Sequence, residues 1–152
     1  MKRVLLCGGL VLLALAAAVP PSNATDTALE TYVGGFDYAA RKQMKVDSAE
    51  LVEWLAAGKA QLVDIRFAEE VAAWGPGFAT AIALPELPER LDELDRTKIL
   101  VTACPHKDRA IIAMVYLRSK GYDARYLEDG LLGLAEHLRG DRAREFVNKL
   151  KP

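Results

Sequence analysis

The sequence predicts a layered α/β domain whose central sheet is at least partly parallel. Lys98–Ala103 is an apolar run of strand length, as expected of a strand that is covered on both faces. Ala110–Leu117 is apolar nearly all round, which is typical of a buried helix. Asp123–Leu127 then has the pattern of another strand. Strand, helix and strand at this spacing form a β-α-β unit, and the two strands of such a unit are parallel.

The remaining elements are expected on both sides of this unit. Asp47, with Glu50 three residues later, is a capping-box arrangement that predicts a helix over Ala49–Ala57, ended by Gly58. The other expected elements are a strand over 61–66, a helix over 69–74, a short charged helix over 88–94 and one or two helices within 131–150. We therefore expect a domain over residues 45–150, with helices on both faces of a mostly parallel sheet, and a weakly structured lead-in over 25–44.

Residues 1–24 have the pattern of a secretory signal peptide. Lys2 and Arg3 precede an apolar run, Val4–Ala18, and a polar stretch follows with a cleavage site at Ser22-x-Ala24. The apolar run is shorter than the ~20 residues that a membrane-spanning helix needs. We expect export, to the periplasm if the source is a Gram-negative bacterium, and no membrane attachment after cleavage. A retained N-terminal anchor is the alternative.

Charge and cysteine content restrict the functional classes. The chain has 20 basic and 21 acidic residues, and without Lys2 and Arg3 its net charge becomes −3. No basic stripe follows a helix face, so we expect no nucleic-acid partner. Of the two cysteines, Cys7 lies in the signal segment and Cys104 remains alone. A lone cysteine cannot form a disulfide within the chain, so it is kept either for packing or for reactivity.

Cys104 lies at the carboxyl end of a central strand and just before a buried helix, where open α/β sheets bind ligands. Free N–H groups and the positive end of the helix dipole favour a thiolate there. His106, Lys107 and Arg109 follow within a few residues, and Asp108 is a candidate N-cap. We expect a Cys104 pKa below that of free cysteine, with Arg109 contributing to the shift. A packed core thiol is the alternative.

These motifs resemble, in order and spacing, those of the rhodanese-like domains. Cys104–Arg109 is similar to the family's active-site loop, a six-residue run that starts with the catalytic cysteine between a strand and a helix. Leu62–Arg66, followed by two glutamates, resembles the family's strand end and its acids. The segment from Gly75 to Pro85 is similar to its turn and next strand, and Tyr126–Gly130 to its glycine turn after the helix. The resemblance covers about residues 45–140.

The resemblance implies a single-domain exported sulfurtransferase without a cofactor or a metal ion. Cys104 would take sulfane sulfur from a small anionic donor such as thiosulfate, carry it as a persulfide, and pass it to a thiol, to cyanide or to a protein acceptor. The loop residues His106, Lys107, Asp108 and Arg109 would bind the substrate, with Arg109 holding the outer sulfur.

Two departures from the family pattern keep a second function open. Pro105 replaces the usual arginine and removes a possible N–H donor, and Lys107 replaces the usual glycine. The alternative is a non-catalytic module that carries a persulfide or senses a ligand, and that docks with a partner protein. Asp64 and Arg66 are interpreted as a structural pair that closes a strand end near the site, and not as catalytic groups.

Two other thiol chemistries are excluded by the residues around Cys104. Cys104-Pro105-His106 also opens the motif of exported thioredoxin-like oxidases, but Lys107 stands where the second cysteine is required. That fold also needs a cis-proline after the active-site helix, and only Pro152 follows Pro105. Phosphatases that share the rhodanese fold use a loop that is one residue longer and ends in arginine, whereas the corresponding position here is Ala110.

Overall fold

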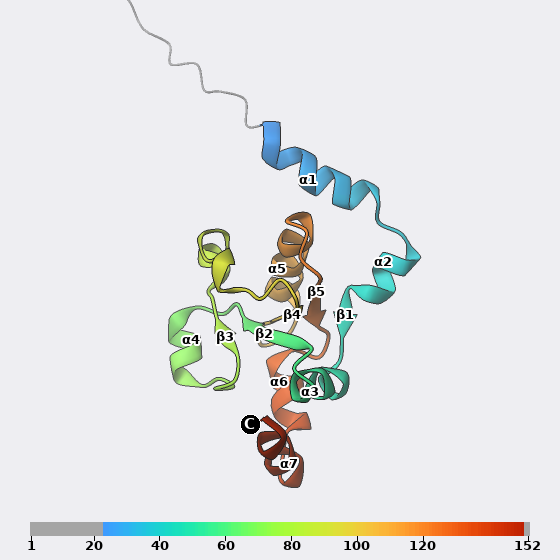
Figure 1. Ribbon diagram of the computed structural model, residues 1–152. Helices are drawn as coiled ribbons and strands as arrows, with labels where there is room; N and C mark the ends of the chain where they lie inside the picture. The colour runs from blue at the N-terminus through green and yellow to red at the C-terminus, as the bar shows by residue number, and fades with distance from the viewer. Residues whose placement is uncertain (1–22, 151–152) are drawn as a thin grey trace, which may run out of the picture.

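The computed structural model describes residues 23–150, so the predicted signal segment lies, apart from its last two residues, outside the described part (Figure 1). The described chain contains one five-stranded sheet with the order β1-β5-β4-β2-β3. The strands are β1 (Lys45–Val46), β2 (Ala60–Asp64), β3 (Thr80–Ala81), β4 (Ile99–Ala103) and β5 (Ala124–Leu127). Every neighbouring pair is parallel, which confirms the predicted parallel sheet.

Helices cover both faces of the sheet, as expected. The α-helices are α1 (Asn23–Gly34), α2 (Tyr38–Gln43), α3 (Ser48–Ala56), α4 (Ala68–Ala73), α5 (Asp108–Ser119), α6 (Gly130–His137) and α7 (Asp141–Leu150); two 3₁₀ helices are η1 (Leu84–Glu89) and η2 (Leu91–Glu93). α5 and the 3₁₀ helices bury one face of the sheet, and α3 and α6 bury the other. In Figure 1, α6 and α7 lie at the lower end of the molecule, below the sheet.

The alternation of side chains along β4 decides which layer contains Cys104. Val101 and Ala103 pack toward α3 and α6, whereas Leu100 packs toward α5. Cys104 continues the even-numbered series and joins the core cluster beneath α5. Thr102 lies between Leu100 and Cys104, and its hydroxyl donates a hydrogen bond of 2.8 Å to the carbonyl of Ala110, which ties β4 to the first turn of α5.

The lead-in differs from its prediction. Residues 25–44 were expected to be weakly structured, but all of them except 35–37 and Met44 lie within α1 and α2. Asp37 caps α2 by accepting a hydrogen bond of 2.7 Å from the N–H of Ala40. α1 packs on α5, and the Tyr32 hydroxyl lies 4.0 Å from the sulfur of Met114. The sequence analysis missed α1 and α2 because they have few apolar positions, and these positions contact residues that are distant in the sequence.

The predicted charged helix over 88–94 is also wrong in type. The segment belongs to two 3₁₀ helices that begin earlier, at Leu84. Pro85 and Pro88 lie in the first of them. Because proline lacks an N–H donor and clashes with the carbonyl four residues earlier, the segment cannot continue as a regular α-helix.

α6 begins directly on the backbone of the loop that carries Cys104. The N–H of Leu131 donates to the carbonyl of Cys104 at 2.8 Å. Gly130 has φ +66°, and a Cβ atom at this residue would lie 2.1 Å from the carbonyl oxygen of His106. This close approach excludes any side chain at residue 130, and it fixes the loop against the start of α6.

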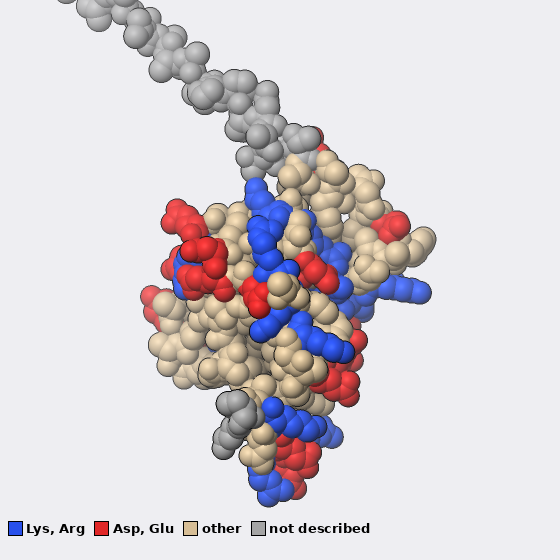
Figure 2. Space-filling view, in the orientation of Figure 1, with Lys and Arg blue, Asp and Glu red and all other residues tan. Residues whose placement is uncertain are grey.

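The surface of the domain has mixed charge. Basic and acidic side chains are interspersed over the face in view (Figure 2). Within residues 23–150, no helix has the length and apolar character that crossing a membrane requires.

We predict that Gly130→Ala destabilises the protein more than Gly121→Ala does. Both glycines have positive φ, but a Cβ atom at Gly121 would meet nothing within 4 Å. The left-handed conformation alone costs about 1–2 kcal/mol for alanine, whereas at Gly130 the backbone of the loop must also move. Urea denaturation measures both free energies of unfolding, and equal losses for the two variants would show that the contact with His106 is not a constraint.

Candidate functional site

The loop from Cys104 to Arg109 surrounds a buried sulfur atom. Cys104 is 0% exposed, and its Sγ lies 3.5 Å from Oδ1 of Asp108, to which the thiol donates. The backbone N–H groups of Ala110, Arg109 and His106 also point at the sulfur. The loop thus provides several backbone donors around one sulfur atom at the start of α5, where unpaired N–H groups favour an anion.

α5 begins two residues earlier than predicted. Asp108 is its first residue and Lys107 is its N-cap, so Asp108 is not the N-cap. The early start brings the carboxylate of Asp108 beside the Cys104 thiol, and it turns the first N–H groups of the helix toward the sulfur. The sequence pattern placed the start at Ala110 because only the apolar residues of the helix carry the periodic signal.

The expected decrease in the Cys104 pKa is wrong. Burial raises the pKa of the Cys104 thiol, because removal from water penalises the thiolate. The N–H groups of Ala110, Arg109 and His106 act in the opposite direction, and the Asp108 carboxylate adds to the increase by accepting the thiol proton. At rest and neutral pH, Cys104 is therefore a protonated thiol.

Arg109 is paired with an acidic residue from another helix. Its Nη1 and Nη2 atoms lie 2.7 and 2.8 Å from the two carboxylate oxygens of Glu70, in a bidentate ion pair. The hydrogen bonds from Arg109 lower the pKa of Glu70 to about 2. Glu70 also accepts the backbone N–H of Phe67 at the start of α4. The guanidinium of Arg109 is thus held at the loop with its charge compensated.

Glu70 is a site residue that the sequence analysis did not select. It belongs to the pair of glutamates that follows β2, which entered the analysis only as part of the family resemblance. The pairing with Arg109 joins residues 39 positions apart, and such a contact leaves no periodic signal in one sequence. The sequence offers one indication of this ion pair: two adjacent acidic residues follow β2, and a loop with several basic residues lies elsewhere in the chain.

Asp64 and Arg66 form a buried ion pair at the end of β2. Arg66 Nη2 lies 2.6 Å from Asp64 Oδ2, and Nε lies 2.9 Å from Oδ1. The Arg66 guanidinium also donates to the carbonyl of Trp74 at 2.9 Å and lies 4.3 Å from the centre of that ring. Between them, the N–H of Ile65 donates to the carbonyl of Ala103 at 3.0 Å. The pair thereby anchors the strand end beside Cys104, and neither side chain is exposed to a substrate.

The other predicted site residues form the rim of the loop. The side chains of His106 and Lys107 are exposed, whereas Arg109 is half-buried. The structure therefore brings Asp108 to the sulfur, leaves His106 and Lys107 at the entrance, and directs Arg109 to Glu70. Among residues 23–150, no group of three or more histidine, cysteine or acidic side chains has the arrangement of a metal site.

Chemically, the arrangement suits a covalent reaction at sulfur. A thiol that loses its proton gains stabilisation from the surrounding N–H donors, and so does a second sulfur atom bound to it.

Comparisons with known proteins agree with this geometry. The sequence model of the rhodanese-like domain family matches residues 47–137 of this chain. The human single-domain sulfurtransferase TSTD1 is 28% identical, with a TM-score of 0.56 over 61% of this chain and 96% of that chain. A rhodanese-like domain protein from Staphylococcus aureus is 27% identical, with a TM-score of 0.55 over 59% of this chain and 89% of that chain.

A rhodanese-related protein from Thermoplasma volcanium is 24% identical and shares the fold, with a TM-score of 0.56 over 61% of this chain and 91% of that chain. The comparison with curated proteins gives no match. Since the family model covers more than half of the chain and its fold is that of the solved relatives, the chain belongs to the rhodanese-like domain family, a family of sulfurtransferase type.

Proposed function

We propose that the protein is a sulfurtransferase that moves sulfane sulfur from a donor such as thiosulfate to a thiol or cyanide acceptor, through a persulfide on Cys104. One observation carries the proposal: the sulfur of Cys104 lies at the start of α5, surrounded by the N–H groups of His106, Arg109 and Ala110. These N–H donors suit a negatively charged outer sulfur. A core cysteine kept only for packing would not need them.

In the first half-reaction, the Cys104 thiol loses its proton to solvent, and the resulting thiolate attacks the outer sulfur of thiosulfate. A bond forms between the two sulfur atoms, the bond from the outer sulfur to the sulfonate group breaks, and sulfite leaves with that electron pair. The negative charge of the thiolate passes to the outer sulfur of the new persulfide. The backbone N–H groups of the loop then donate hydrogen bonds to this atom, and their fixed orientation avoids the cost of rearranging a solvent shell.

In the second half-reaction, an acceptor thiolate or cyanide attacks the same outer sulfur. The sulfur–sulfur bond of the persulfide breaks, and its electrons return to Cys104 as a thiolate. The thiolate then regains a proton from solvent, and the resting thiol donates its S–H group to the Asp108 carboxylate. Glu70 is a positioning residue in this scheme, because it fixes Arg109 at the end of the loop.

The second candidate function is a non-catalytic carrier of persulfide sulfur that docks with a partner. Complete burial of Cys104 and the raised pKa of its thiol favour this alternative, since both slow the attack on a free donor. Turnover of thiosulfate and cyanide by the purified protein separates the two. Repeated formation of thiocyanate is expected for the enzyme, and a single sulfur loaded without turnover for the carrier.

We predict that Cys104→Ser lowers thiocyanate formation by more than about 100-fold and abolishes loading of sulfur, because the hydroxyl cannot form a persulfide. Ser119→Ala, at the opposite end of α5 from Cys104, is the matched control and is expected to retain loading. Mass spectrometry after incubation with thiosulfate shows the added sulfur. A Cys104→Ser protein that still gains sulfur would refute the proposed site.

We also predict that Asp108→Asn lowers the pKa of Cys104. The Asp108 carboxylate stabilises the protonated thiol and opposes a thiolate, so its removal favours the thiolate. The pH dependence of alkylation by iodoacetamide measures this pKa, which we expect to exceed that of free cysteine in the unmodified protein. Asp92→Asn, on the exposed surface of η2, is the control and leaves the profile unchanged. An identical profile for Asp108→Asn would show that the carboxylate does not act on the thiol.

A further inference from the structure

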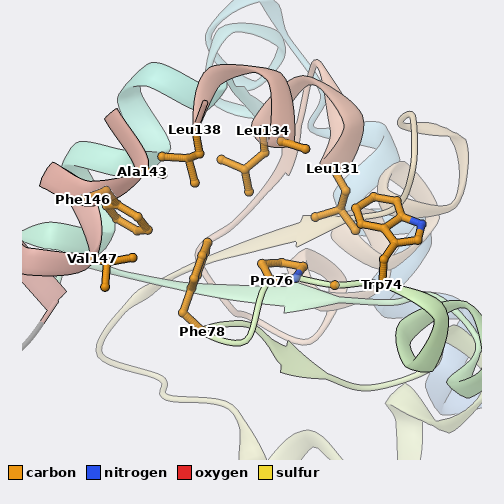
Figure 3. Close-up of a pocket in the computed structure, with 11 residues that line it drawn as sticks. Trp74, Pro76, Phe78, Leu131, Leu134, Leu138, Ala143, Phe146 and Val147 are labelled. Atoms are coloured by element: carbon orange, nitrogen blue, oxygen red, sulfur yellow. The ribbon is translucent and has the colours of Figure 1, made fainter. Parts of the chain in front are cut away.

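An apolar pocket opens between α6, α7 and the segment that connects α4 to β3 (Figure 3). Its volume is about 280 Å³. Trp74 and Phe78 come from the connecting segment, Leu131 and Leu134 from α6, and Phe146 from α7. The rings of Phe78 and Phe146 meet edge to face, with centroids 5.0 Å apart, and form one end of the pocket.

The pocket is not the anion-binding loop of the family. One of its walls is built by α7 (Asp141–Leu150), which lies beyond the residues that the family model matches. None of the described residues that line it carries a charge. Thiosulfate and cyanide are therefore not its occupants, because a small anion would lose its hydration there without gaining a partner.

Two of the lining residues are each one contact away from the Cys104 loop. Leu131 donates its N–H to the carbonyl of Cys104 at 2.8 Å. Trp74 follows Glu70 by one helical turn, and Glu70 holds Arg109 at the other end of the loop. Leu131 and Trp74 are therefore neighbours of both the pocket and the residues that fix the loop.

The size and polarity of the pocket indicate the kind of group that fills it. Its volume lies just below the ~300 Å³ at which sites for whole small molecules begin, and it has no convergent polar groups to orient such a molecule. A compact apolar part of a larger molecule fits better, such as an alkyl chain of about six carbons or one aromatic ring. The polar end of that molecule is then left outside the pocket.

We propose that this pocket binds the alkyl or aryl part of an organic thiol or persulfide, and so makes an organic sulfur carrier the preferred partner of Cys104. The proposal rests on the sulfurtransferase function proposed above. In the transfer, the thiolate of the carrier attacks the outer sulfur of the Cys104 persulfide, the persulfide bond breaks, and Cys104 leaves as a thiolate. The carrier becomes the persulfide, and the reverse reaction loads Cys104 from it.

The first experiment tests binding without any sulfur chemistry. The chain has two tryptophans, so the indole N–H signals of Trp74 and Trp54 are separate NMR probes, and Trp54 does not line the pocket. Titration with 1-hexanol is expected to shift the Trp74 signal and to leave that of Trp54 in place. Affinity is expected to increase about fourfold for each methylene from butanol to hexanol.

The second experiment measures sulfur transfer from preloaded Cys104 to ethanethiol, butanethiol and hexanethiol, whose thiol groups are chemically alike. The second-order rate constant is expected to rise along the series by about 15-fold for two methylenes. Ala135→Phe places a ring into the pocket from an exposed position of α6 and is expected to abolish both the Trp74 shift and the chain-length preference. Leu132→Phe, on the same helix but outside the pocket, is the matched control and keeps both.

The outcomes separate this proposal from the function on which it rests. Sulfur transfer that does not depend on chain length, or an unshifted Trp74 signal, overturns the substrate assignment alone. Failure to load sulfur on Cys104, with hexanol binding retained, overturns the sulfurtransferase function and the substrate assignment with it. A preference that persists in Ala135→Phe also overturns the assignment, since the pocket is then not its cause.

Discussion

The close approach of Gly130 to the backbone of His106 is the constraint on which the site depends. It allows α6 to begin on the loop, so that the N–H of Leu131 reaches the carbonyl of Cys104. On the opposite side, the ion pair of Glu70 and Arg109 holds the last residue of the loop. With both ends fixed, the N–H groups between them keep their orientation toward one sulfur atom, which is the condition for stabilising a charge that exists only during the reaction.

Burial and the helix terminus act on Cys104 in opposite directions, and burial dominates at rest. The N–H groups favour a thiolate, but the complete removal of the sulfur from water raises the pKa of the thiol. The donors therefore cannot serve mainly to keep a reactive thiolate in the free protein. In the proposed reaction, they gain their full effect once the thiol has lost its proton and an outer sulfur has entered the loop. In the proposed function, a protonated resting thiol alternates with a persulfide that the N–H groups stabilise.

The parts of this design differ in how far the sequence reveals them. β4, α5 and β5 could be predicted because their apolar patterns are local and periodic, and the glycine turn at Gly130 because its spacing matches a family. The ion pair of Glu70 with Arg109 could not, because it joins two helices, α4 and α5, that are far apart in the sequence. The pKa direction of Cys104 was predicted wrongly for the same reason: the helix dipole is visible in the sequence order, whereas burial depends on residues from several distant elements.

The charge balance of the site has a consequence for the kind of donor that it favours. The cations Lys107 and Arg109 are opposed by Asp108 at the sulfur and by Glu70 at the end of the loop, so the loop has little net charge near neutral pH. Long-range attraction of an anionic donor depends on net charge and is screened by salt, whereas N–H groups act only at contact. In the proposed reaction, the N–H groups therefore recognise sulfur at contact, and the loop attracts an anionic donor only weakly from a distance. An organic carrier therefore gains little from long-range attraction, and the apolar wall that α7 adds beyond the family fold is the contact surface that we infer for it.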